Sequence, residues 1–215
     1  MLRLKRDTSA VLTAIAVFSA NAAFGGDLRE AAVKTHPSQG DVKVVAEARS
    51  HLGASADGIF VNMDTSKLTP GHVHTLWLVT INEPAACESS PCTSKDVLKR
   101  TEIVKADVGY LDGVVVGADG SAQFNGFQHT GALQGAWFSD GLKSTEAVEV
   151  HLVINDHGPV IDGMVGEMLT TYRAGCTDES IPAPMPATAR ADGTPGPNAC
   201  KLVQFSIFEP AEQNS

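Results

Sequence analysis

Four histidines stand in two short stretches whose spacing suits transition-metal binding. His72 and His74 lie two residues apart in Gly-His-Val-His-Thr-Leu-Trp, and His151 and His157 begin and end His-Leu-Val-Ile-Asn-Asp-His. Imidazole nitrogens bind zinc or copper(II) at ~2.0–2.1 Å, and a carboxylate commonly completes the ligand set. The carboxylates that could do so here are Asp156, Glu149 and Asp162.

The first histidine pair stands at the start of an extended strand predicted for residues 72–81. Pro70-Gly71 indicates a turn before this strand, and Asn82-Glu83-Pro84 ends it. Side chains alternate between the two faces of a strand. His72 and His74 therefore share one face with Leu76, Leu78 and Thr80. We expect the other face to be the core face, with Trp77 buried among Val73, Thr75, Val79 and Ile81.

His151 belongs to a strand predicted for residues 147–155, and His157 lies just after that strand, beside Asp156. Val148, Val150, Leu152 and Ile154 alternate there with Glu149, His151, Val153 and Asn155. If the two strands are neighbours, the imidazoles of both stretches meet at one end of the sheet. We therefore predict that the two strand ends are adjacent.

A structural interpretation of the same histidines stays open. His72 would then cap the turn after Gly71, His151 would be a polar strand residue, and His157-Gly158-Pro159 would only shape a bend. Imidazole nitrogens of His72, His74 and His151 within ~5 Å of a common point would favour the metal site.

Other catalytic signatures are absent from the sequence. It contains no Gly-x-Ser-x-Gly elbow, no dinucleotide-binding glycine fingerprint and no phosphate-binding Gly-Lys-Ser/Thr loop. A cupin-like start at Gly71-His72 lacks the Glu that should follow. Trp137-Phe138, in the glycine-rich stretch 131–145, would form either a sugar-binding platform or a loop anchor in the core.

The first 22 residues have the pattern of a signal peptide. Arg3, Lys5 and Arg6 precede an apolar run, Ala10–Phe18, and Ser19-Ala-Asn-Ala22 provides the small residues of a cleavage site. The run is far shorter than the ~20 residues that a membrane span needs, and no later segment is long and apolar enough. We expect a secreted or periplasmic protein without a membrane span.

The four cysteines predict two disulfides in such a compartment. Three pairings are possible, and the favoured one is local: Cys87–Cys92 and Cys176–Cys200. The spacings lack the Cys-x-x-Cys pairs of zinc-thiolate sites, which argues against a metal bound by the cysteines.

The remaining segments predict an all-β fold. Strands are expected at residues 42–48, 58–64, 104–110, 113–117, 122–128, 168–172 and 201–208, with a hairpin turn at Asp119-Gly120. Residues 27–39 are expected to form a short helix or an unformed leader, and residues 94–102 one or two helical turns. Prolines between 181 and 198 predict an extended loop.

These elements indicate a single antiparallel β-sandwich, Greek-key-like, or a flattened barrel with long loops. Residues 27–57 would form a leader and first strand, and residues 58–208 the sandwich, within one domain. The net charge of −9 argues against nucleic acid as a partner.

The two histidine stretches resemble a group of secreted bacterial β-sandwich proteins without an assigned activity, over roughly residues 58–208. The resemblance implies fold and export. A weaker likeness extends to chordin-type domains and to copper/zinc superoxide dismutases, which are sandwiches with a His-x-His strand. No histidine lies between His74 and His129, so dismutation is not implied.

The function expected from the sequence is that of an exported soluble binding or surface-interaction module whose loops contact an extracellular ligand or protein. The alternative is a zinc- or copper-binding protein, possibly an enzyme, that uses His72, His74, His151 and His157. The choice depends on where the fold places these four side chains.

Overall fold

The structure is a computed structural model that describes residues 28–181 and 184–211. The predicted signal peptide lies outside the described residues. Eight antiparallel strands form one sheet in the order β5-β4-β7-β8-β1-β2-β3-β6. The strands are β1 (Arg29–Thr35), β2 (Val44–Ser55), β3 (Gly58–Thr65), β4 (His72–Ile81), β5 (Ala106–Val115), β6 (Ala122–His129), β7 (Glu149–Pro159) and β8 (Lys201–Phe208).

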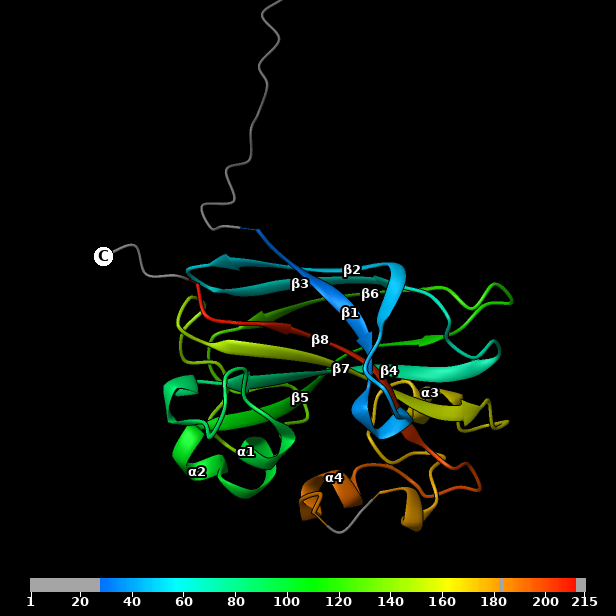
Figure 1. The fold of residues 1–215 in the computed structure, drawn as a ribbon. Coiled ribbons are helices and arrows are strands. Elements are labelled where there is room, and N and C mark those ends of the chain that lie inside the picture. Colours follow the sequence, from blue (N-terminus) through cyan, green and yellow to red (C-terminus); the bar gives the residue numbers. More distant parts are fainter. Residues whose placement is uncertain (1–27, 182–183, 212–215) are drawn as a thin grey trace, which may run out of the picture.

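The sheet curves until β5 and β6, the two strands at the ends of this order, approach each other, which makes it a nearly closed barrel (Figure 1). The backbone N–H of Asn125 in β6 donates to Asp112 Oδ2 in β5 at 2.8 Å. Closure protects the edges of β5 and β6, which would otherwise present unpaired backbone groups. The prediction of an all-β sandwich or flattened barrel is confirmed.

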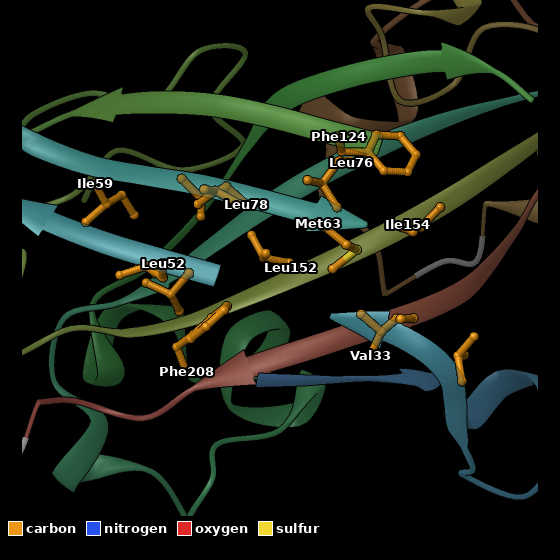
Figure 2. Close-up of a cluster of buried hydrophobic side chains, with 14 of the residues drawn as sticks. Val33, Leu52, Ile59, Met63, Leu76, Leu78, Phe124, Leu152, Ile154 and Phe208 are labelled. Carbon is orange, nitrogen blue, oxygen red and sulfur yellow. The ribbon is translucent and has the colours of Figure 1, made fainter. Parts of the chain in front are cut away.

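The barrel interior is a continuous apolar core (Figure 2). Leu76 and Leu78 of β4 face Leu152 and Ile154 of β7 there, and Phe124 of β6 completes the group. The strand face that carries the histidines thus points into the barrel. This corrects our prediction that the Trp77 face alone is the core face.

The Trp77 face is nevertheless buried, because short helices and loops cover the outside of the sheet at this point. Trp77 itself is 1% exposed, as predicted. The covering helices are α1 (Ser94–Lys99), α2 (Thr101–Val104), α3 (Val165–Met168) and α4 (Ala187–Ala191), with the 3-10 turns η1 (Pro37–Gln39), η2 (Pro84–Ala86) and η3 (Asp178–Ser180). Each face of β4 therefore packs into its own apolar core, one inside the barrel and one between the sheet and the segments that cover it.

Four local predictions are wrong. Residues 29–35 form strand β1, because pairing with β2 and β8 outweighs their helix propensity. Residues 165–168 form helix α3, where a strand was expected at 168–172. A turn forms at Gly120, but the strands beside it pair with β4 and β3, so no hairpin ladder results. The proline-rich segment contains helix α4.

Other predictions are confirmed. Strand β8 covers residues 201–208, and residues 94–104 form two short helices. Both disulfides have the expected local pairing, Cys87–Cys92 and Cys176–Cys200. None of the helices among the described residues has the length and apolar character needed to cross a membrane.

Candidate functional site

The two histidine stretches lie side by side, because β4 pairs with β7 along its whole length. His72 is opposite Pro159, and His74 is opposite Asp156. The predicted proximity of the strand ends is confirmed.

Three of these side chains form a cluster at the end of the barrel. His72 Nδ1 lies 2.9 Å from Asp156 Oδ1, and His74 Nε2 lies 3.8 Å from Asp156 Oδ2. The two imidazole rings stack with their centroids 6.3 Å apart. His74 is fully buried, and Asp156 is almost fully buried. Burial lowers the pKa of His74, against the opposing effect of Asp156, so its imidazole is neutral.

A bulge in β7 fixes the Asp156 carboxylate. The pairing advances by three residues in β7 while β4 advances by two, and Gly158 adopts a φ of 81° at this point. Its N–H donates to Asp156 Oδ1 at 2.8 Å. A Cβ on Gly158 would lie 2.7 Å from Asn198, whose side chain donates to the carbonyls of His157 and Pro159. Glycine is therefore required here both for its conformation and for space.

His157 points to the opposite face of the sheet and is not part of this cluster. Its Nε2 lies 2.8 Å from Thr75 Oγ1, and its Nδ1 lies 3.0 Å from the carbonyl oxygen of Ala174. Complete burial lowers its pKa to about 4. A neutral ring with a partner on each nitrogen anchors the segment around Ala174 to the sheet.

His151 lies far along β7, opposite Val79. Its face is that of Trp77, whereas His74 faces the barrel interior. The four histidines therefore do not converge: His72 and His74 lie on one face of the sheet, and His151 and His157 lie on the other. The reason is the period of two along a strand: Asp156 shares a face with Ile154, while His151 and His157 share the other. Of the three carboxylates considered, Asp156 joins His72 and His74, Glu149 joins His151, and Asp162 is exposed.

Among the described residues, a single group of three potential ligand residues has ligand atoms that all lie within 4.8 Å of one another: His157, Cys176 and Cys200. The two cysteines form a disulfide with each other. Metal binding needs thiolates, which a disulfide does not provide. This group does not fit a metal ion while the disulfide is intact.

A cleft of about 600 Å³ lies on the outer face of the sheet. Its floor consists of strand residues from β4, β5, β7 and β8: Trp77, Val79, Val108, Val153, Leu202, Phe205 and Ile207. Its walls come from η1, the Cys87–Cys92 loop with α1, the loop that carries Trp137, and the segments at Tyr172 and Met185. The volume is within the usual range of small-molecule sites, ~300–1,000 Å³.

Aromatic rings form one wall of the cleft. The ring centroids of Trp77, Trp137 and Tyr172 lie 4.6 to 5.6 Å apart. Tyr172 is almost fully buried, which raises its pKa and keeps the phenol neutral. The edge-to-face contacts of Tyr172 with both indoles hold the three rings in fixed positions. Trp137 therefore anchors its loop over the cleft, one of the two roles expected for it.

A histidine–glutamate pair supplies the main polar group of the cleft. His151 lines the cleft, and its Nε2 lies 2.6 Å from Glu149 Oε1. The same oxygen accepts the Cys92 backbone N–H at 2.8 Å, so it acts as an acceptor and Nε2 carries the proton. In the neutral ring with this tautomer, Nδ1 is an acceptor.

Sequence reasoning missed this cleft. His151 was identified, but as a metal ligand, and the floor residues were read only as core positions. The alternation of Val153 with interior residues shows that the outer face of the strand is also apolar. It does not show that the loops leave an open space over that face.

Comparison of the chain with protein-family models, with curated proteins and with solved structures finds no match in any of the three.

Proposed function

We propose that this is an exported binding protein whose cleft takes a small, largely apolar molecule that carries a hydroxyl group. The observation that supports it most is the cleft itself, an aromatic and aliphatic space lined by the imidazole of His151, which Glu149 orients. The two disulfides support export, because such bonds persist in oxidising compartments.

The apolar body of the ligand follows from the floor and walls. The floor consists largely of valine, leucine, isoleucine and phenylalanine side chains from four strands. A ligand that displaces water from them is stabilised by about 25 cal/mol per Å² of apolar surface buried. The aromatic side chains of Trp77, Trp137 and Tyr172 line the cleft and favour an aromatic ligand, which can make edge-to-face or offset contacts with them.

The hydroxyl group follows from the tautomer of His151. With Nε2–H directed to Glu149, the free Nδ1 lone pair accepts a hydrogen bond and does not donate one. A ligand O–H satisfies it, and a ligand with an ether oxygen at the same place leaves it unpaired. One hydrogen bond of this kind contributes about 0.5–1.5 kcal/mol.

Tryptophan fluorescence tests the proposal without a label, since the chain has two tryptophans and both line the cleft. We expect 2-naphthol to quench the emission in a saturable way and to bind several-fold more tightly than 2-methoxynaphthalene. Val153→Phe, which fills the floor, should weaken both ligands at least tenfold. Val115→Phe is the matched control, because Val115 is on β5 outside the cleft and 40% exposed.

The two parts of the proposal fail separately. Equal affinity of both naphthalenes, or a preference that persists in His151→Phe, would refute the hydroxyl contact alone. Unchanged affinity in Val153→Phe would show that the cleft is not the binding site.

A further inference from the structure

Three buried polar atoms without a hydrogen-bond partner gather in one place, away from the cleft. They are Nδ1 and Nε2 of His74 and Oδ2 of Asp156. An unpaired buried polar group costs about 1–3 kcal/mol, so native structures give most such groups a partner. Two of the three, His74 Nε2 and Asp156 Oδ2, belong to side chains that are 0% and 1% exposed and lie 3.8 Å apart, as two ligand atoms of one ion would.

The spacing of two of these atoms fits one metal ion. His74 Nε2 and Asp156 Oδ2 lie 3.8 Å apart, too far for a hydrogen bond. Two ligand atoms that each lie ~2.0–2.2 Å from a common ion are separated by no more than roughly 4.3 Å. The separation of 3.8 Å is therefore compatible with both atoms binding one ion.

The surroundings supply a route to solvent and a third ligand. The His72 side chain is 26% exposed, and its ring stacks on that of His74. Nδ1 of His72 lies 2.9 Å from Oδ1, the other oxygen of the Asp156 carboxylate. Because the ring reaches the surface, it can turn toward an ion at Oδ2, with water in the remaining positions.

The chemistry of these groups selects the kind of ion. A neutral imidazole and a carboxylate are the ligand types of zinc and copper(II), whereas calcium and magnesium prefer oxygen ligands alone. The Gly158 N–H holds the first oxygen of Asp156, and this outer contact orients the carboxylate as partners of metal ligands commonly do.

We propose that His74 and Asp156, with His72 on the solvent side, bind one divalent transition-metal ion, and that zinc is the ion bound. The site is distinct from the cleft, because His74 faces the barrel interior and the cleft lies on the outer face of the sheet. It uses two of the four histidines considered from the sequence, and it is independent of ligand binding in the cleft.

Calorimetric titration of chelator-treated protein, purified without a histidine tag, tests the proposal with zinc chloride alone. We expect one zinc ion per chain. His74→Ala and Asp156→Asn should each lower the affinity at least tenfold. His129→Ala is the matched control, since His129 is an exposed histidine elsewhere on the barrel and should bind zinc as the unaltered protein does.

A second variant covers the case in which the buried substitutions prevent folding. His72→Ala changes a partly exposed side chain, and we expect it to weaken zinc binding severalfold in a folded protein. Copper(II) bound in place of zinc should show nitrogen hyperfine coupling in its electron paramagnetic resonance spectrum. Absence of zinc binding, or binding that His72→Ala and Asp156→Asn leave unchanged, would overturn the proposal and leave water as the partner of these atoms.

Discussion

Asp96 is a carboxylate that the fold keeps ionised in a buried position. It is 0% exposed and accepts hydrogen bonds from the backbone N–H groups of Glu88 and Thr93, both at 3.0 Å, and from Arg100 Nη1 at 2.7 Å. Burial alone would raise its pKa, but these bonds outweigh burial and lower the pKa to about 2. Asp96 thereby fixes the loop that forms one wall of the cleft.

The stability that Asp96 contributes should depend on pH. Its pKa is about 2 in the folded chain and ~3.9 in an unfolded one, so the contribution is complete above pH ~4 and is lost as the pH falls toward 2. Asp96→Asn should have a lower free energy of unfolding than the unaltered protein at pH 6. Between pH 4 and 2 the free energy of unfolding should fall by up to about 2 kcal/mol less in Asp96→Asn than in the unaltered protein. Urea unfolding at pH 6, 4 and 2.5 measures this. Asp41→Asn, at an exposed aspartate, is the control; parallel curves for Asp96→Asn and the unaltered protein would contradict the assignment.

At the scale of elements, the covering segments approach the sheet closely enough to need glycine. A Cβ on Gly113 of β5 would lie 2.2 Å from the carbonyl oxygen of Leu169, just after α3. A Cβ on Gly109 would lie 2.5 Å from Cβ of Leu133 in the loop that carries Trp137. Two segments therefore pack closely on β5, one on each of its faces, and its glycines set their distance from the sheet.

Gly113→Ala should destabilise the protein by about 1–3 kcal/mol, the usual cost of forcing extra atoms into a packed contact. Gly166→Ala is the control: Gly166 lies in α3, and an added Cβ there meets nothing within 4 Å. It should be neutral or stabilise by up to about 1 kcal/mol, because alanine favours helix. Denaturant midpoints of the two variants give the comparison, and equal midpoints would mean that α3 does not press on β5.

At the scale of the whole molecule, strand β1 completes the barrel. It pairs with β2 on one side and with β8 on the other, and its Val33 is fully buried in the barrel core. The first strand in the chain thus joins the last one. Strands β1 and β2 thus belong to the same sheet as β3 to β8.

A chain that begins at Asp41 lacks β1 and should lose the cooperative thermal unfolding that a chain beginning at Leu28 retains. The physical reason is that β2 and β8 would each gain an unpaired edge while the core would open at Val33. Circular dichroism during heating compares the two chains. A shared midpoint would show that strands β2 to β8 fold without β1.

The sequence alone determined those features that depend on local pattern. The alternation of apolar side chains in residues 72–81 and 201–208 predicted β4 and β8, because a β-strand is the regular structure in which side chains repeat every two residues. The short separations of Cys87 from Cys92, and of Cys176 from Cys200, favoured the pairing that the structure has. Burial of Trp77 followed from its place in the strand.

Tertiary structure alone decided what the histidines do. Local pattern showed that two strands carry them, but the register of β4 on β7 places Asp156 beside His74 and sends His151 and His157 to the other face. A shift of one residue would exchange these faces, and register is set by pairing between distant segments and by the bulge at Gly158. The cleft has the same origin, since its floor and walls come from segments that only the closed barrel brings together.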